Sequence, residues 1–178
     1  PATAAEIAAV EAQWASRDPR ARDVIEHASS PILIGGGVGI VRVFSHDVDG
    51  NRHYGATLVP LGASPRSLPV VVFTHGGDAG VNVDDFALLL LLLGERTRNY
   101  VFVIPSFRSE PLTVGGSVYN SGGAPSPWDR DVDDALAFLD VALVHVPEAD
   151  PERIGVLGAS RGGAVALLMA IRDSRIDL

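Results

Sequence analysis

The feature that most constrains the fold is an alternation of strand-like and helix-like patterns from residue 69 onward. Residues 70–73 and 101–104 are continuous runs of β-branched and aromatic side chains, a pattern typical of parallel strands buried on both faces. Residues 154–157 form a third strand-like run, and helical patterns at 84–98 and 126–146 lie between the three. The alternation predicts an α/β fold with a mostly parallel sheet, flanking helices and right-handed crossovers.

The third run leads directly into the sequence GASRGG at residues 158–163. The spacing G-x-S-x-G places a serine on a tight turn between a strand and a helix, with one glycine making room for the bend and the other letting the helix approach the strand. We therefore predict that Ser160 has strained backbone torsions and an exposed hydroxyl, as a catalytic nucleophile has. The alternative is an ordinary glycine-rich turn, which the strand before and the alanine-rich helical pattern after the motif disfavour.

A second glycine-containing loop follows the first strand and reads HGGD at residues 75–78. Glycines at the carboxyl end of a strand let backbone N–H groups point into the crevice where open α/β sheets bind ligands. In a serine hydrolase one oxyanion donor comes from such a loop and another from the amide after the nucleophile. We expect these donors to be the amides of Gly77, or its neighbours Gly76 and Asp78, and of Arg161. His75 is interpreted as a support of the loop and not as the catalytic base.

Composition excludes several classes of partner. The net charge is −8 and no Lys/Arg cluster exists, which disfavours nucleic acid. The six leucines at 88–93 are too few to cross a bilayer, which takes about 20 apolar residues, so we expect a buried helix there. No secretory pattern opens the chain, and Pro1 is compatible with loss of an initiator methionine, signal removal or a partial reading frame. We expect a soluble protein, either cytoplasmic or exported.

Three further patterns resemble cofactor or metal sites but lack required residues. Residues 35–39 are glycine-rich, yet no third glycine has the dinucleotide-binding spacing and a strand follows instead of a helix. Asp47 and Asp49 resemble the start of a calcium loop, but Arg52 replaces its glycine. Aspartates at 129, 131, 133 and 134 have no accompanying histidine and suit the positive end of a helix that Ser126 caps. We therefore expect neither a cofactor nor a metal.

The first 30 residues are expected to form a helical extension that packs on the main domain at 31–178. Within the extension we expect a helix from residue 3, broken near Pro19, and a second short helix through Val24 and Ile25. In the main domain, the pair Asp49-Gly50 between two β-rich runs predicts a hairpin.

The polar residues outside the two motifs receive structural interpretations. Histidines 27, 46, 53 and 145 are expected on the surface. Residues 109–127, which are rich in glycine, serine and proline, are expected to line or cover the site, because long loops are uncommon unless they are functional. Arg108 at the start of this stretch could bind a substrate carboxylate, but a pairing with a nearby acid is favoured.

Taken in order, these segments resemble the N-terminal part of an α/β-hydrolase, in particular the prolyl-oligopeptidase-like and dienelactone-hydrolase-like branches. The matching pieces are LVP at 58–60, VVFTHGG at 71–77, VIPSFR at 103–108, DVDDAL at 131–136 and DPERIGVLGASRGG at 150–163. The resemblance covers about residues 31 to 175. It implies that the chain holds the first five of the family's eight strands in the order 1-2-4-3-5, with Ser160 as nucleophile, and is truncated after the helix that follows it.

The resemblance also implies a serine hydrolase that cleaves an ester or peptide bond of a small-molecule or peptide substrate through an acyl-enzyme. In this family the triad acid and histidine follow the serine. Asp173 and Asp177 follow Ser160, but no histidine does. We therefore expect the chain alone to be nearly inactive and poorly soluble, with an exposed and strongly apolar edge strand at 154–157. Two alternatives stay open: a non-catalytic binding or scaffold protein, and an N-terminal fragment that pairs with a separate C-terminal remainder of the fold.

Overall fold

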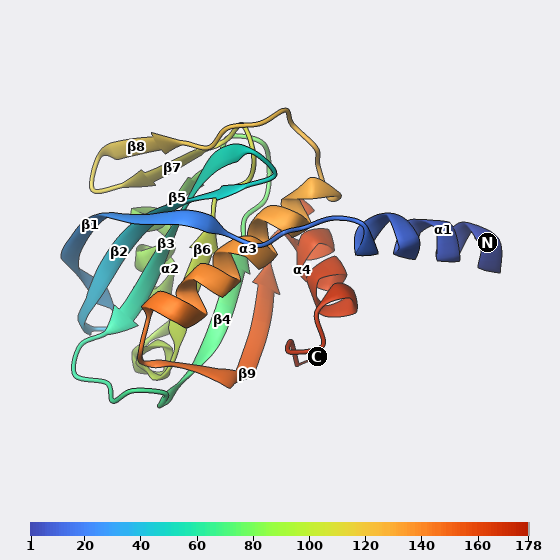
Figure 1. Ribbon diagram of the computed structural model, residues 1–178. Helices are drawn as coiled ribbons and strands as arrows, with labels where there is room; N and C mark the ends of the chain where they lie inside the picture. Colours follow the sequence, from blue (N-terminus) through green and yellow to red (C-terminus); the bar gives the residue numbers. More distant parts are fainter. Residues whose placement is uncertain (178) are drawn as a thin grey trace.

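The computed structural model describes residues 1–177 and contains one large mixed sheet flanked by helices (Figure 1). The six strands of the large sheet, in spatial order, are β1 (Arg22–Ile34), β2 (Gly37–Val48), β3 (Asn51–Pro60), β6 (Val101–Pro105), β4 (Leu68–Thr74) and β9 (Ala149–Gly158). A small second sheet consists of β5 (Val81–Asn82), β7 (Pro111–Val114) and β8 (Ser117–Asn120). The helices are α1 (Ala4–Ala15), α2 (Val83–Leu93), the 3-10 helix η1 (Glu95–Asn99), α3 (Arg130–His145) and α4 (Arg161–Arg172).

The strand order confirms the predicted arrangement around the serine. Strand β4 pairs in parallel with β6 on one side and with β9 on the other. In chain order, strands β2, β3, β4, β6 and β9 lie in the spatial order 1-2-4-3-5. Because β4 and β9 run in parallel, the loop after β4 and the turn after β9 leave the same edge of the sheet. The two glycine motifs are thereby brought together.

The first three strands form antiparallel pairs, and the outermost of them corrects a prediction. Strands β2 and β3 join through Asp49 and Gly50, both with positive φ, which is the two-residue hairpin that the sequence indicated. The predicted helix through Val24 and Ile25 is wrong, because β1 pairs with β2 along this segment. The predicted domain boundary between residues 30 and 31 therefore falls inside a strand of the main sheet. Long-range pairing here overrides local helical preference.

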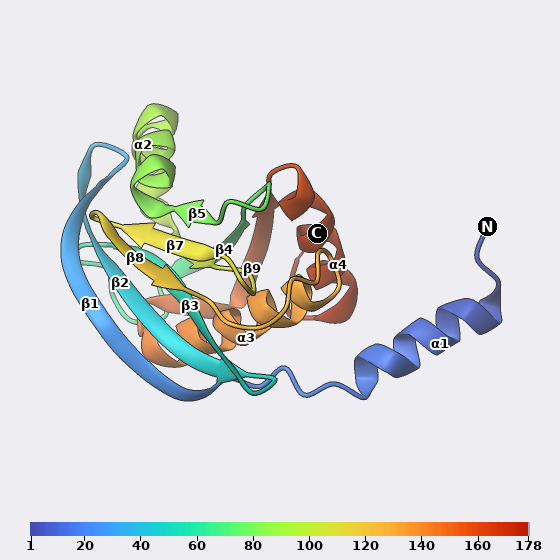
Figure 2. The ribbon, with the colours of Figure 1, turned by 90° about the horizontal axis from the view of Figure 1, so that it is seen from above.

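Helices cover both faces of the sheet, as Figure 2 shows from above. Helices α3 and α4 pack on one face around Phe138, Leu139 and Met169, all fully buried. Helix α2 and the small sheet pack on the other face around Phe86, Leu90 and Leu112. Helix α1 projects away from the body in both views and buries none of its residues. Near its C-terminal end, Trp14 lies 5.2 Å from the guanidinium of Arg172, and Arg17, just after the helix, pairs with Asp129 of the main domain.

Three predicted helix features need correction. The helix expected at 84–98 ends at Leu93, because Gly94 turns the chain with a φ of 84°, and a 3-10 helix follows. Its leucine run is not buried: the exposed leucines are Leu88, Leu89, Leu91, Leu92 and Leu93. Helix α3 begins at Arg130 and not after Ser126, because Trp128 has a φ of 66°, which a right-handed helix does not accept.

Strand β9 is the outermost strand of the large sheet, as expected for residues 154–157, but its edge is not strongly apolar. Ile154 is buried, and the exposed residues of the strand include Glu152 and Arg153 as well as Leu157. The end of the chain partly covers this edge, since the amide of Asp177 donates to the carbonyl of Ile154 over 2.8 Å. Within residues 1–177, no helix combines the length and apolar character needed to cross a membrane.

Candidate active site

Ser160 lies between the end of β9 and the start of α4, with a φ of 52° and a ψ of −118°. A positive φ is rare for a residue with a side chain and costs on the order of 1–3 kcal/mol, so the surrounding structure must hold it in place. This confirms the predicted sharp turn with unusual torsions. The turn is fastened to β4: the amide of Ala159 donates to the carbonyl of Thr74 over 3.1 Å, and the Thr74 hydroxyl donates to the carbonyl of Gly162 over 2.8 Å.

The glycines on either side of Ser160 are required by close approaches of the backbone. A Cβ at Gly158 would lie 2.2 Å from the carbonyl oxygen of Gly162, and a Cβ at Gly162 would lie 1.9 Å from that of Thr74. No side chain fits in either place. Both glycines of the G-x-S-x-G pattern are therefore needed for this turn, which is the packing reason that the sequence predicted.

The HGGD loop after β4 lies directly against Ser160. A Cβ at Gly76 would lie 2.9 Å from the Cβ of Ser160 and 2.7 Å from the carbonyl oxygen of Ala159, so only glycine lets the loop come this close. Gly77 has a φ of 71° and open space where a side chain would be. The structure therefore brings together all the residues that the sequence predicted for the site: the HGGD loop, Ser160 and Arg161.

His75 is buried, and its ring faces Phe107. Its ring stacks on Phe107 with 4.3 Å between centroids, and its Nδ1 lies 3.3 Å from the carbonyl oxygen of Gly76. Burial lowers the pKa of His75 to about 4, although the Gly76 carbonyl works in the opposite direction. The ring is thus neutral near pH 7 and 3.6 Å from the carboxylate of Glu110, which agrees with support of the loop.

The Arg161 side chain connects the serine turn to three other segments. One terminal nitrogen, Nη1, donates to the carbonyl of Gly77 over 2.6 Å and pairs with Glu110 over 2.7 Å. The other nitrogens, Nε and Nη2, lie 3.0 and 2.9 Å from one carboxylate oxygen of Asp131. The guanidinium also lies 5.0 Å from the centre of the Phe107 ring. From sequence, only the backbone amide of Arg161 was predicted for the site, and this side-chain network was not.

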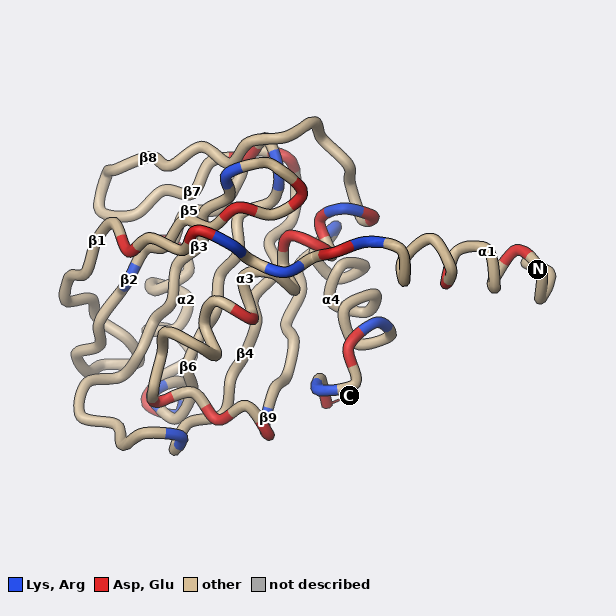
Figure 3. The backbone as a smooth tube through the Cα atoms, viewed as in Figure 1, with Lys and Arg blue, Asp and Glu red and all other residues tan. Residues whose placement is uncertain are grey.

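The acidic cluster at the start of α3 is bound by arginines and not arranged as a metal site. Asp131, Asp133 and Asp134 are buried, and each pairs with at least one arginine from a distant part of the chain; these arginines are Arg17, Arg108, Arg161 and Arg172. Arg130, on the same helix, also lies 3.9 Å from Asp133. Figure 3 shows these basic and acidic segments gathered around the beginning of the helix. Among residues 1–177, no group of three or more potential ligands could hold a metal ion.

Arg108 takes the structural role that the sequence favoured. Its Nη2 lies 2.6 Å from Asp134, and its backbone amide and Nε both donate to the same carboxylate over 3.0 Å. Burial raises the pKa of Asp134 to about 6, although the hydrogen bonds from Arg108 work in the opposite direction. A buried arginine with this much of its hydrogen-bonding capacity used is a brace between the loop after β6 and α3.

Comparisons with known proteins identify the fold. No protein-family model matches the sequence, and no curated protein matches it. An acetyl xylan esterase from Paenibacillus sp. R4 superposes with a TM-score of 0.58 at 23% identity, over 95% of this chain and 55% of the other. A hypothetical protein from Pseudomonas aeruginosa, PA2218, gives 0.59 at 23% identity, over 78% and 40%, and a glucuronoyl esterase from Solibacter usitatus gives 0.57 at 13%, over 90% and 51%.

The chain has the α/β-hydrolase fold. It spans between 40% and 55% of the length of these three solved structures. Identities of this size establish the fold and not the reaction.

Within this α/β-hydrolase fold, the stretch 109–127 is not the long loop that the sequence suggested. It contains the hairpin of β7 and β8, which packs over the first strands of the sheet, with Tyr119 beside Tyr54 at 5.5 Å between ring centroids. Glu110 is the residue of this stretch that reaches the Ser160 region. Sequence spacing could not identify Glu110, because this residue follows β6 whereas its partner Arg161 follows β9.

Two predicted surface histidines are buried in the hairpin of β2 and β3. His46 is 1% exposed and His53 is 0% exposed, and none of their four ring nitrogens has a hydrogen-bond partner. The rings lie 5.9 Å apart, and His46 also contacts Phe138 of α3. The prediction was wrong because both residues point from the sheet toward α3. Neither is hydrogen-bonded to Ser160.

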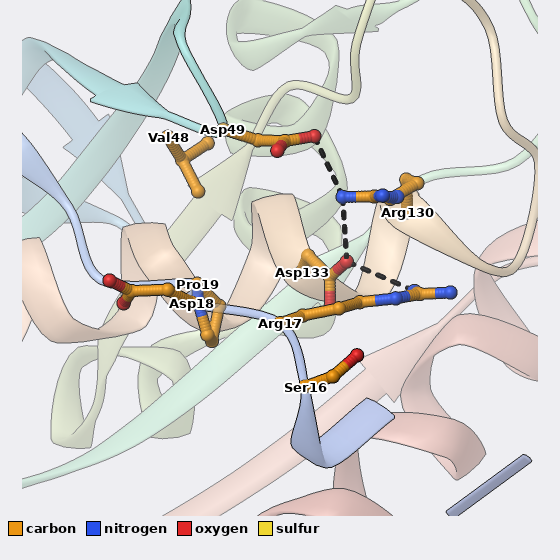
Figure 4. Close-up of a pocket in the computed structure, with 8 residues that line it drawn as sticks. All are labelled: Ser16, Arg17, Asp18, Pro19, Val48, Asp49, Arg130 and Asp133. Atoms are coloured by element: carbon orange, nitrogen blue, oxygen red, sulfur yellow. Dashed lines mark hydrogen bonds and ion pairs between the residues drawn. The ribbon is translucent and has the colours of Figure 1, made fainter. Parts of the chain in front are cut away.

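A cavity of about 230 Å³ lies beside the beginning of α3 and is shown in Figure 4. It is lined by Ser16, Arg17, Asp18, Pro19, Val48, Asp49, Arg130 and Asp133, so it does not include the serine turn. The labelled Arg17 and Arg130 both point toward Asp133, which makes this cavity a gap in an ion-pair network.

Proposed function

We propose that this chain carries the nucleophile and the oxyanion-binding part of a serine hydrolase that cleaves esters through an acyl-enzyme. The observation that carries the proposal is the strained turn at Ser160, which lies against Gly76 in a loop where two consecutive glycines leave the backbone uncovered. Strained torsions of this kind cost free energy, and they cluster at functional sites.

In the proposed reaction, the hydroxyl oxygen of Ser160 attacks the ester carbonyl while a base removes the hydroxyl proton. The carbonyl oxygen becomes an oxyanion, which the amide of Arg161 and an amide of residues 76–78 stabilise. When the intermediate collapses, the alcohol leaves with the proton from the base, and the acyl group stays on the serine. Water then repeats the sequence with the acyl group as electrophile, which releases the acid and restores the hydroxyl.

We further propose that the base and its supporting acid come from residues outside residues 1–177. His75 is turned toward Phe107 and Glu110, and His46 and His53 are buried in a hairpin. In the described part of the chain, none of the histidine hydrogen bonds leads to Ser160. The solved structures of the same fold are about twice as long, which is consistent with further strands that supply both groups.

An ester is the substrate class that we favour over a peptide. Two of the structures with the same fold are an acetyl xylan esterase and a glucuronoyl esterase by name, although both are less than 25% identical to this chain. Alternatives that the sequence left open, a peptidase or a non-catalytic scaffold, are outcomes of the test below.

The test compares p-nitrophenyl acetate with the corresponding anilide, using the longest polypeptide that the gene encodes. We expect release of nitrophenol with an initial burst that matches the enzyme concentration, or a steady release where deacylation is fast. Ser160→Ala should remove this activity, by about 10⁴-fold or more. Ser174→Ala is the matched control, since Ser174 is exposed just beyond the same helix and should leave the rate unchanged.

Each outcome discriminates between the proposals. Cleavage of the anilide at a rate comparable to the ester indicates a peptidase. Activity that survives Ser160→Ala, or a folded wild-type protein that cleaves neither substrate, rejects the serine hydrolase and favours a binding role.

A further inference from the structure

The guanidinium of Arg161 is the point where four segments of the site meet. It starts on the residue after Ser160 and bonds the Gly77 carbonyl of the loop after β4. It also pairs with Glu110, in the segment that follows β6, and with Asp131, in the first turn of α3. These segments come from regions of the chain 30 to 84 residues away from Arg161. A single side chain therefore links the serine turn to the loop after β4, to the segment after β6 and to the first turn of α3.

The environment of the guanidinium leaves it little freedom to move. The Arg161 side chain is 12% exposed, and the carboxylates of Glu110 and Asp131 are 6% and 0% exposed. Burial opposes the charged form, but the bonds to Glu110 and Asp131 outweigh it and raise the pKa of Arg161. The face of the Phe107 ring lies under the guanidinium, and the same ring stacks on His75. Arg161 is therefore charged and fixed in one orientation.

The bond to Gly77 controls the loop because the peptide unit is planar. A trans peptide places the N–H of the next residue opposite to the carbonyl oxygen, so holding the Gly77 carbonyl also fixes the direction of the Asp78 amide. Gly77 itself has a φ of 71° and open space where a side chain would be. Because glycine accepts many torsions, the bond from Arg161 restricts a peptide that the residue itself leaves free to rotate.

We propose that the side chain of Arg161 is a positioning group that holds the loop at residues 76–78 in the orientation that binds the oxyanion. The inference rests on the proposed function, in which this loop supplies an oxyanion donor. Arg161 then has two separate parts in the site, with its backbone amide as a donor and its side chain as the clamp of the other donor.

Lysine cannot replace arginine in this position. Nη1 donates to the Gly77 carbonyl and also lies 2.7 Å from Glu110, while Nε and Nη2 lie 3.0 and 2.9 Å from Asp131. An ammonium group on a flexible stem keeps the charge but not the planar fork. Arg161→Lys therefore separates loss of geometry from loss of charge.

The first experiment measures the NMR order parameters of the backbone N–H groups of Gly77 and Asp78 in the 178-residue chain, where no catalysis is needed. Arg161→Lys should lower the order parameters at these two residues from about 0.85, typical of a rigid backbone, to below about 0.6, because the Gly77 carbonyl loses the donor that holds its peptide unit. The matched control is Arg172→Lys on the same helix, because Arg172 is 8% exposed and pairs with Asp133. The control should leave the order parameters of the loop unchanged, and an equal fall in both variants overturns the inference.

The second experiment measures ester hydrolysis in the form of the protein that is active. Arg161→Lys should lower kcat on the order of tenfold to a hundredfold with little change in KM, because misplaced oxyanion donors act on the transition state. Unchanged kcat in this variant overturns the inference while leaving the proposed function intact. A fall in kcat without lower order parameters at the loop also overturns it, since the guanidinium would then act directly on the substrate.

Failure of the proposed function gives a different result. If the wild-type protein hydrolyses no ester, the proposed function fails, and lower order parameters in Arg161→Lys still show that the side chain holds the loop. If Arg161→Lys does not fold, Glu110→Gln takes its place, because it removes one anionic partner and keeps a similar shape. It should lower the order parameters of Gly77 and Asp78 to a smaller extent, and no change in that variant overturns the inference.

Discussion

Helices α3 and α2, on opposite faces of the sheet, invert the usual relation between residue type and burial. Helix α3 carries three buried aspartates, at positions 131, 133 and 134. Helix α2 ends in six leucines, of which only Leu90 is buried, while Leu92 is 78% exposed. The reason is what the rest of the chain places against each helix. Arginines from elsewhere surround the beginning of α3, whereas α2 contacts the sheet along one side only.

Burial of a charged side chain therefore depends on an oppositely charged partner, and exposure of a leucine depends on which surfaces lie next to it. A buried carboxylate is stable only when a cation compensates the loss of hydration. An apolar helix contributes to stability only through the residues that another surface covers. Matched substitutions on each helix test both of these dependences.

The largest effect is expected from removing a buried aspartate of α3. Asp134→Ala leaves the guanidinium of Arg108 buried without its partner, so we expect the free energy of unfolding to fall by about 3–5 kcal/mol. Asp140→Ala on the same helix is the control, because Asp140 is 39% exposed and pairs with the exposed Arg175, and should cost less than about 1 kcal/mol. Urea denaturation measures both. Equal effects would show that the arginines around α3 contribute nothing specific.

A smaller effect is expected on α2, where two neighbouring leucines differ in burial. Leu90→Ala should cost about 2–4 kcal/mol, because the side chain is 1% exposed and its removal leaves a cavity among core residues. Leu92→Ala should change the free energy of unfolding by less than about 0.5 kcal/mol. The same denaturation experiment decides. A large loss in Leu92→Ala would mean that the exposed leucines are covered in solution.

The histidine pair on the α3 side predicts a dependence of stability on pH. Burial lowers the pKa of His46 to about 3; His53 and Arg52 lower it further, and Asp47 works in the opposite direction. Burial lowers the pKa of His53 to about 4; Arg108 lowers it further, and Asp47 and Asp49 work in the opposite direction. Both rings are thus neutral in the folded state where the unfolded chain, with a pKa of 6.5, binds protons.

The sign follows from this difference. Stability contributed by the neutral rings is present above pH 6.5 and is lost as the pH falls toward 4, by about 3 kcal/mol for each ring. His46→Phe, which suits the contact with Phe138, should flatten the unfolding free energy between pH 7 and pH 4.5. An unaltered slope in His46→Phe contradicts the assignment.

The turn at Ser160 could be predicted from sequence because its causes are local. Gly158 and Gly162 are dictated by backbone contacts within the turn and with the adjacent strand, and a short pattern records both. The parallel pairing of β4, β6 and β9 could be predicted because continuous runs of β-branched residues separated by helices are typical of a parallel sheet. The resemblance to a known family supplied the strand order itself.

The features that could not be predicted depend on contacts between distant segments. The leucines of α2 form a helix as expected, but their exposure depends on which surfaces lie opposite. Strand β1 follows from pairing with β2, and its residues carry no alternation that distinguishes it. The side-chain contacts of Arg161 with Glu110 and Asp131 join positions that no spacing relates.

The most direct test of the central claim, that Ser160 is a nucleophile, is its covalent reaction with a fluorophosphonate. The longest polypeptide that the gene encodes is incubated with the reagent, digested and mapped by mass spectrometry. We predict one adduct, on the peptide that contains Ser160, which is absent in Ser160→Ala and present in Ser174→Ala. A folded protein that gives no adduct, or one that is modified at another serine, would contradict the claim.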